Sequence, residues 1–109
     1  MAYSSTAAHV LDALGVPTRR AVLELLREGP RAVVDIAAEL PVSRPAVSQH
    51  LRVLKGAGLV TERTDGTRHL YRVDTDGLTA LRTYLESFWT DALAAFKQAA
   101  EHEQEGDTP

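Results

Sequence analysis

The sequence predicts a mainly α-helical domain with one β-hairpin, in the order helix, helix, helix, helix, strand, strand, helix. Over most of the chain, apolar residues recur three or four positions apart, which is the spacing of amphipathic helices. The exception lies around Asp65-Gly66, a dipeptide typical of two-residue hairpin turns, which separates two short strand-like runs. A chain of 109 residues has enough apolar sequence for one core, so we expect residues 1–109 to form a single domain.

Glycine and proline divide the N-terminal part into three short helices. The first is predicted over residues 6–14 and ends at a glycine. The second begins at Pro17, because a proline in the first turn lacks only an N–H group that has no intrahelical partner. It ends at Gly29-Pro30, and a third helix follows that Pro41 terminates.

A fourth helix is predicted over residues 43–55, with Ser43 as its N-cap. On a helical wheel, Val47, Leu51 and Leu54 fall within about 60° of one another, so they should form its buried face. The connection between the third and fourth helices is short. The two helices are therefore expected to form a helix-turn-helix.

Two strands, over residues 59–64 and 67–73, should form a hairpin joined by a type I′ turn at Asp65-Gly66. A hairpin directly after a helix-turn-helix makes a wing, so the predicted fold is a winged helix-turn-helix whose core and wing span residues 18–73. A long final helix is predicted over residues 75–103, and the acidic residues 104–109 are expected to be disordered.

Charge is distributed unevenly along the chain. Residues 18–72 hold ten Lys and Arg against six Asp and Glu, a local charge of +4, whereas residues 73–109 carry −6 and the whole chain −3. A cationic middle fits a face that meets the phosphates of nucleic acid.

The composition also excludes several classes of function. The chain contains no cysteine, so disulfides, thiolate metal sites and thiol nucleophiles are excluded. No apolar stretch is long enough for a membrane span and no signal peptide is recognised, which favours a cytoplasmic protein. Ser48 and His50 lie two positions apart on a helix and point in different directions, so we expect no enzyme activity.

The outer face of the fourth helix carries side chains that can contact DNA. Gln pairs with adenine, Arg pairs with guanine, and Ser contacts either base. Such a face also suits a helix that is merely solvated, or a winged-helix module that binds another protein. The basic hairpin downstream favours DNA. The predicted DNA-binding residues are Ser43, Arg44, Pro45, Ser48, Gln49, Arg52, Lys55, Arg63 and Arg68.

Several motifs resemble the ArsR family of bacterial winged-helix repressors. They are Pro17-Thr18-Arg19-Arg20, Glu24-Leu25-Leu26, LPVSRPAVSQHLRVLKGAGLV over residues 40–60, Gly66-Thr67-Arg68-His69-Leu70-Tyr71-Arg72, and Leu85-Glu86-Ser87-Phe88-Trp89. The resemblance covers about residues 7–98, and residues 40–60 carry its most specific part. Where many relatives have a capping Asp or a capping Ser or Thr, this chain has Val16 and Ala32.

The resemblance implies a homodimer that binds an inverted-repeat operator in double-stranded DNA and represses its own operon. The first and last helices would pair, and the wing would touch the DNA backbone or minor groove. The apolar seam of the last helix independently suggests a partner surface, although its aromatic residues could instead fold back on the monomer core. The predicted dimer-interface residues are Val10, Leu11, Leu14, Leu81, Leu85, Phe88, Trp89, Ala92 and Phe96.

Many relatives in this family release DNA when a metal ion binds, so their metal-ligand patterns can be compared with this sequence. The third helix has no cysteine, and the family's D-x-H and H-x-x-E pattern on the last helix aligns with Trp89, Asp91, His102 and Glu105, so only its second half matches. His9 and His69 are isolated in the sequence. We therefore expect no metal ion or cofactor, and the sequence does not identify a small-molecule effector.

Overall fold

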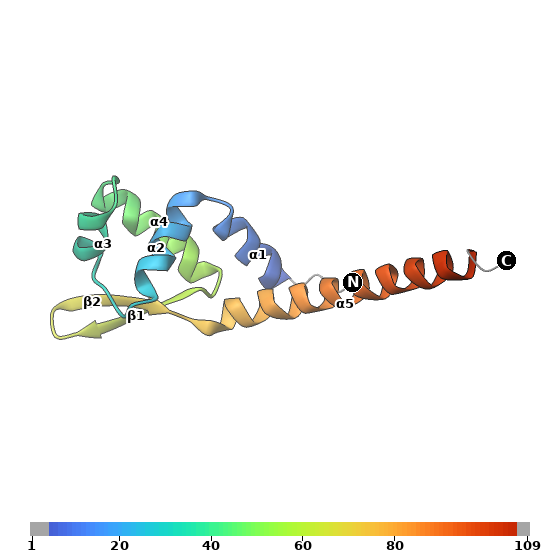
Figure 1. Cartoon of the computed structure of the whole chain (residues 1–109). Helices are drawn as coiled ribbons and strands as arrows, with labels where there is room; N and C mark the ends of the chain where they lie inside the picture. The colour runs from blue at the N-terminus through green and yellow to red at the C-terminus, as the bar shows by residue number, and fades with distance from the viewer. Residues whose placement is uncertain (1–4, 107–109) are drawn as a thin grey trace.

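The computed structural model describes the backbone of residues 5–106 and the side chains of residues 5–103 (Figure 1). Within this part of the chain it has five helices and one hairpin, in the predicted order. The elements are α1 (Ser5–Leu14), α2 (Pro17–Leu26), α3 (Val33–Glu39), α4 (Arg44–Gly56), β1 (Val60–Asp65), β2 (Arg68–Val73) and α5 (Thr75–Gly106).

One hydrophobic core joins the first four helices to the base of the hairpin. Val10 of α1, Val22 of α2 and Ile36 of α3 are fully buried within it. The predicted inner face of α4 is confirmed, because Val47, Leu51 and Leu54 all have 0% exposure. Burial of this face fixes the rotation of α4, so its opposite face must point to solvent.

The predicted helix caps are also as expected. Ser43 is the N-cap of α4, and its Oγ accepts a hydrogen bond from the Ala46 backbone N–H at 3.3 Å. Val16 and Ala32 precede α2 and α3 without a side-chain cap. At the other end of α1, the Nη1 of Arg20 donates to the Leu14 carbonyl at 2.7 Å, which places positive charge at a helix C-terminus.

The turn of the hairpin differs from the prediction. Asp65 pairs with Arg68, so the two-residue loop is Gly66-Thr67 rather than Asp65-Gly66. Gly66 has φ +64°. In the described chain only glycines have a positive φ, so the φ of Thr67 is negative. A type I′ turn needs two positive φ values, whereas a glycine at the first position alone is typical of type II′. The predicted type I′ turn is therefore wrong.

An isolated β-bridge joins the hairpin to the α2–α3 loop. The Arg31 N–H donates to the Tyr71 carbonyl at 2.9 Å, and the Tyr71 N–H donates to the Arg31 carbonyl at 2.8 Å. Strand β2 is thus paired on both sides, and β1 is the free edge. The wing is attached to the helical body by backbone hydrogen bonds.

A close backbone approach joins α5 to the body. The Gly77 N–H donates to the Gly58 carbonyl at 2.8 Å, and a Cβ at position 77 would lie only 2.6 Å from the Ala57 carbonyl oxygen. Only glycine allows this approach without a shift of backbone. The start of α5 is therefore fixed against the turn between α4 and β1.

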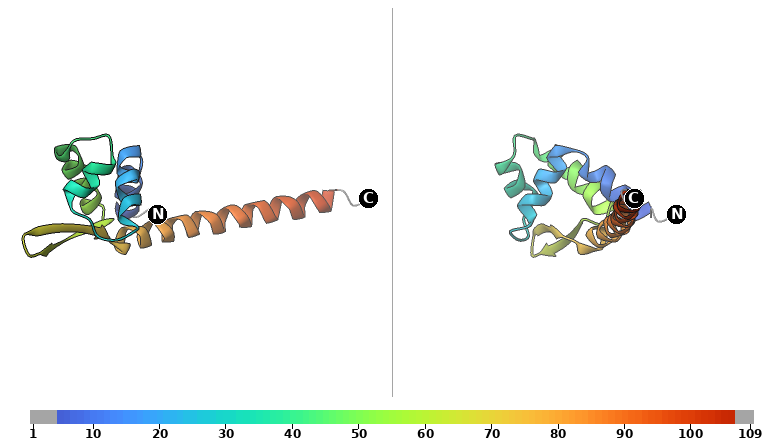
Figure 2. Two further views of the ribbon diagram at one scale, coloured as in Figure 1. Left: turned by 60° about the vertical axis from the view of Figure 1, so that its left-hand side comes forward. Right: turned by 45° about the vertical axis from the view of Figure 1, so that its right-hand side comes forward.

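Helix α5 packs against α1 near its start and then extends away from the body (Figures 1 and 2). Its 32 residues correspond to about 48 Å. The chain measures 76 × 26 × 21 Å and has a radius of gyration of 19.8 Å, against about 13 Å for a compact chain of this length. Residues 104–106 are helical, so the expectation of disorder from residue 104 is wrong there, and residues 107–109 lie outside the described chain.

Candidate nucleic-acid interface

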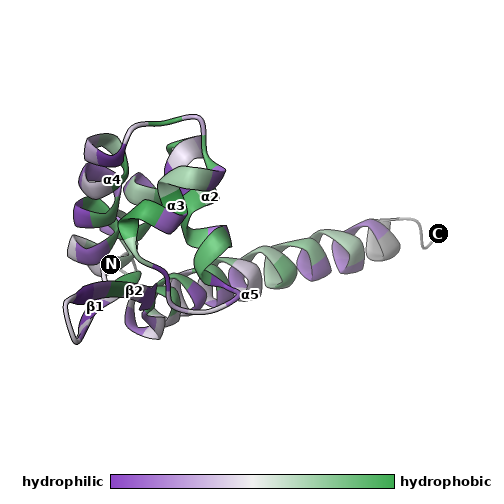
Figure 3. Cartoon of the chain, turned by 90° about the vertical axis from the view of Figure 1, so that its left-hand side faces the viewer, coloured by the Kyte–Doolittle hydropathy of each residue, from purple (hydrophilic) through white to green (hydrophobic). Residues whose placement is uncertain are grey.

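The outer face of α4 is polar and open to solvent. Ser48, Gln49 and Arg52 are exposed opposite the buried stripe, and Arg44 and Pro45 are exposed in the first turn. Figure 3 shows hydrophilic residues on the outer side of α4 and hydrophobic residues toward the body. This arrangement matches a recognition helix whose N-terminal residues reach base edges.

Two arginines of α4 have no acidic partner. Neither Arg44 nor Arg52 lies within 4 Å of a carboxylate oxygen among residues 5–103. Burial and the Glu62 carboxylate raise the pKa of Tyr71, and the positive charge of Arg52 opposes this rise, which places Arg52 close to the base of the wing. Both guanidinium groups are free to bind phosphate or a base edge.

Two other predicted DNA-binding residues are held in ion pairs. Lys55 Nζ lies 3.5 Å from Glu62 Oε2, and Arg68 Nη2 lies 2.9 Å from Asp35 Oδ2. The pairs are at the surface, with 56% of the Lys55 side chain and 59% of the Arg68 side chain exposed. Exposed pairs contribute little stability, so a phosphate can replace either carboxylate at small cost.

The carboxylate of Glu62 links the wing to the end of α4. His69 Nδ1 lies 2.8 Å from Glu62 Oε1, on the strand opposite, and Lys55 approaches the other oxygen. The hydrogen bond with His69 lowers the pKa of Glu62; desolvation raises it, and Lys55 adds to the lowering. His69 is isolated in the sequence but not in the fold.

Arg63 lies on the other face of the hairpin. The register pairs Arg63 with Leu70 and Thr61 with Arg72, so all four share that face. Arg63 and Arg72 line a cleft beside Pro30. Arg72 was not predicted as a binding residue, because its position beside Arg63 depends on the strand register.

The predicted dimer residues fall into two groups. Val10 is fully buried in the chain's own core, so it presents no surface to a partner, and Leu14 and Leu81 are half-buried against that core. The remaining residues are exposed: Leu11 (37%), Leu85 (50%), Phe88 (65%), Trp89 (65%), Phe96 (74%) and Ala92. The alternative that the aromatic residues fold back on the core is wrong.

Leu85, Phe88 and Trp89 border a shallow groove on α5 of about 490 Å³. It is lined by Leu78, Leu81, Arg82, Leu85, Glu86, Phe88 and Trp89. Leu93 continues the apolar surface with 49% exposure. We refer to this groove as the α5 groove.

The described residues do not bring together three or more side chains of the types His, Asp or Glu that could hold a metal ion. Trp89, Asp91 and His102 are all exposed on α5, and the side chain of Glu105 lies outside the described part. In α3, Glu39 pairs with Arg31 and Asp35 with Arg68. The expectation of no metal remains a prediction.

Comparison with known proteins gives the family. A family model described as "Bacterial regulatory protein, arsR family" matches residues 16–62, which include α2, α3 and α4. The HTH-type transcriptional regulator Rv2034 of Mycobacterium tuberculosis is 56% identical over 92 residues, covering 84% of this chain and 86% of the relative. The chain belongs to the ArsR family of transcription regulators. The resemblance to this family that the sequence motifs indicated is thereby confirmed.

Two further comparisons concern repression and assembly. The HTH-type transcriptional repressor SmtB of M. tuberculosis is 45% identical over 67 residues, which cover 62% of this chain but only 50% of that relative. The solution structure of a homodimeric winged helix-turn-helix DNA-binding domain, Mb0332 from Mycobacterium bovis, is 31% identical with a TM-score of 0.62. It covers 95% of this chain and 86% of that domain, which confirms the predicted winged helix-turn-helix fold.

Within residues 5–106, no helix is both long enough and apolar enough to cross a membrane.

Proposed function

We propose that this ArsR-family protein is a homodimeric repressor that binds an inverted-repeat operator through α4 and the wing. The observation that carries the proposal is the outer face of α4, where Ser48, Gln49 and Arg52 are exposed and Arg52 has no acidic partner in the described chain. Amide, hydroxyl and guanidinium groups at this place suit major-groove readout. We further propose that it acts in the cytoplasm, on DNA, without catalysis or a bound metal.

The apolar surface of α5 supports a dimer. Phe88, Trp89 and Phe96 are each at least 65% exposed, and aromatic side chains bury about 150–250 Å² each. Together with the exposed leucines they leave a patch above the few hundred Å² that monomers usually expose. A second copy of α5 is a partner of matching length and hydrophobicity.

A two-fold dimer also explains how α4 would read DNA. Two recognition helices about 34–36 Å apart reach successive major grooves on one side of the duplex, so a two-fold protein matches a two-fold operator. In each chain, α5 leaves the body at the end away from the wing (Figure 1). Pairing through α5 therefore leaves both wings and both copies of α4 open to DNA.

The test is selection of bound duplexes from a random pool, followed by titration of the selected duplex at several salt concentrations. We expect an inverted repeat and an affinity that falls linearly with log salt. Arg52→Ala should relax discrimination at particular base pairs, because it removes a base contact, whereas Arg68→Ala should weaken binding to all sequences alike.

Several outcomes would contradict the proposal. They are selection of no consensus, an affinity independent of salt, or equal loss of specific and random binding in both variants. A reporter gene under the selected operator then separates repression from activation, since a repressor lowers expression in proportion to its operator affinity.

A further inference from the structure

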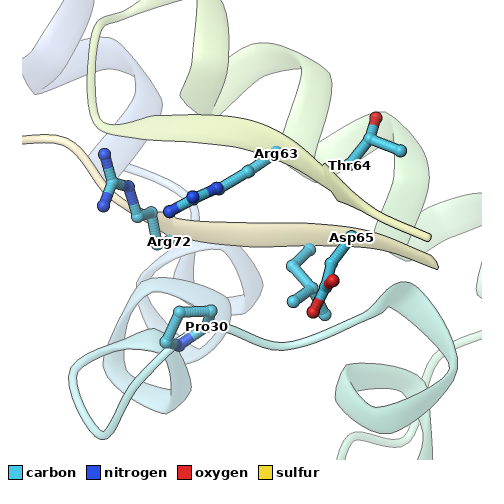
Figure 4. A pocket seen from close by; sticks show the side chains of 6 residues that line it. Pro30, Arg63, Thr64, Asp65 and Arg72 are labelled. Carbon is cyan, nitrogen blue, oxygen red and sulfur yellow. The ribbon is translucent and has the colours of Figure 1, made fainter.

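The wing carries a cleft of about 320 Å³ between the hairpin and the α2–α3 loop (Figure 4). It is lined by Pro30, Arg63, Thr64, Asp65, Leu70 and Arg72. We refer to it as the wing cleft. It lies on the opposite face of the hairpin from the Glu62–His69 pair, as the strand register requires.

Two positive charges meet at one end of the wing cleft. Because Arg63 is opposite Leu70 and Arg72 is opposite Thr61, the two arginines are diagonal neighbours on one face of the hairpin, within reach of each other's long side chains. Figure 4 shows the guanidinium group of Arg63 extending toward Arg72, with Asp65 at the other end of the wing cleft. The arginine end is therefore the cationic end.

The two charges are not compensated within the described chain. Neither Arg63 nor Arg72 belongs to any of its ion pairs, although Arg31 and Arg68 nearby are both paired. Arg72 Nε donates to Thr61 Oγ1 at 3.3 Å, which positions the side chain and leaves its terminal NH₂ groups available. An anion placed between the two positive charges is attracted to both.

We propose that the wing cleft binds a phosphate group, with Arg63 and Arg72 as its ligands. Guanidinium groups present planar pairs of N–H donors that match phosphate oxygens. Pro30 and Leu70 add an apolar wall, which reduces competition from water. The phosphate comes from the backbone of operator DNA, in which case this inference rests on the proposed function, or from a free small molecule, in which case it does not.

The DNA source is tested with Arg72→Gln, which removes the charge of a residue outside the core. If Arg72 holds a backbone phosphate, operator affinity should fall about tenfold for each contact, and so about 100-fold for a dimer that loses both. The slope of log affinity against log salt should also decrease by about 1.8, because each of the two protomers loses one phosphate contact worth about 0.9. The matched control is Arg27→Gln, another exposed arginine, which is paired with Glu24 of α2 and does not line the wing cleft. It should change neither quantity.

The free-molecule source is tested without DNA. Inorganic phosphate is titrated against sodium chloride of equal ionic strength while backbone amide resonances are recorded. Binding should give saturable shifts around residues 63 and 72 that chloride does not produce, and Arg72→Gln should abolish them. A positive titration with an unchanged salt slope assigns the wing cleft to a free phosphorylated molecule. A reduced slope assigns it to DNA.

The proposal is overturned if phosphate gives no specific shift and Arg72→Gln leaves the salt slope unchanged. Wild-type protein that still binds its operator in an Arg52-dependent way would then keep the proposed function intact. Conversely, if wild-type protein binds no DNA, the phosphate titration still decides whether the wing cleft is an anion site.

Discussion

Truncation of Trp89 should weaken the proposed dimer strongly while leaving the fold of each chain unchanged. The Trp89 side chain projects from α5 with 65% of its surface exposed. For a side chain of about 240 Å² this leaves about 160 Å² to be covered by a partner. At about 25 cal/mol per Å², complete burial contributes about 4 kcal/mol for each protomer, or about 8 kcal/mol for a dimer with two copies of Trp89.

The expected loss is smaller than this maximum, because alanine keeps part of the contact and the tryptophan side chain loses conformational freedom when it is buried. We expect Trp89→Ala to weaken the dimer by about 2–4 kcal/mol, which raises the dissociation constant about 30-fold to 1000-fold. Sedimentation equilibrium over a wide range of protein concentration measures this constant, and circular dichroism checks helix content.

The control is Gln98→Ala, an exposed residue on the side of α5 opposite Trp89. It should leave the dissociation constant unchanged within experimental error. The reasoning is refuted if wild-type protein sediments as a monomer at tens of micromolar, or if Trp89→Ala and Gln98→Ala give the same dissociation constant.

Three other predictions concern the stability of the fold. Gly77→Ala should destabilise the fold by about 2–3 kcal/mol in urea denaturation, because its Cβ would overlap backbone oxygen atoms. Unchanged stability would contradict this, because the backbone around residue 77 could then shift at little cost. Ser43→Ala should lose about 0.5–2 kcal/mol of stability with its N-cap, and Ser43→Asp should restore it; an unchanged melting temperature for Ser43→Ala would contradict this role. Because folding lowers the pKa of Glu62, its carboxylate stabilises the native state above the ordinary value of 4.5 and loses this effect as pH falls below it. Glu62→Gln should flatten the acid limb of stability against pH, and an unaltered limb would remove Glu62 as its cause.

Much of the fold follows from local sequence. Helix boundaries at Pro17, Ser43 and Gly29-Pro30 depend on backbone restrictions that act within a few residues, so the observed helices begin and end close to the predicted positions. The inner face of α4 follows from periodicity alone. The turn was misplaced by one residue because the choice between types I′ and II′ depends on strand register, which the dipeptide does not determine.

The candidate site was only partly predictable for the same reason. Periodicity identifies the exposed residues of α4, but it does not identify which cations are neutralised by acids distant in sequence. Arg68 pairs with Asp35, 33 positions away, whereas Arg72 gains its place beside Arg63 only through the hairpin register. Tertiary contacts thus divide the arginines of the wing into paired and unpaired ones.

The junction at Gly77 makes α5 a lever arm. The helix is about 48 Å long, so a rotation of about 5° at its base displaces its far end by about 4 Å. In a dimer joined through α5, the same rotation changes the distance between the two copies of α4 relative to the fixed repeat of DNA. In the proposed dimer, the backbone contact between Gly77 and Gly58 would therefore set how strictly the protein discriminates between operators with different half-site spacing.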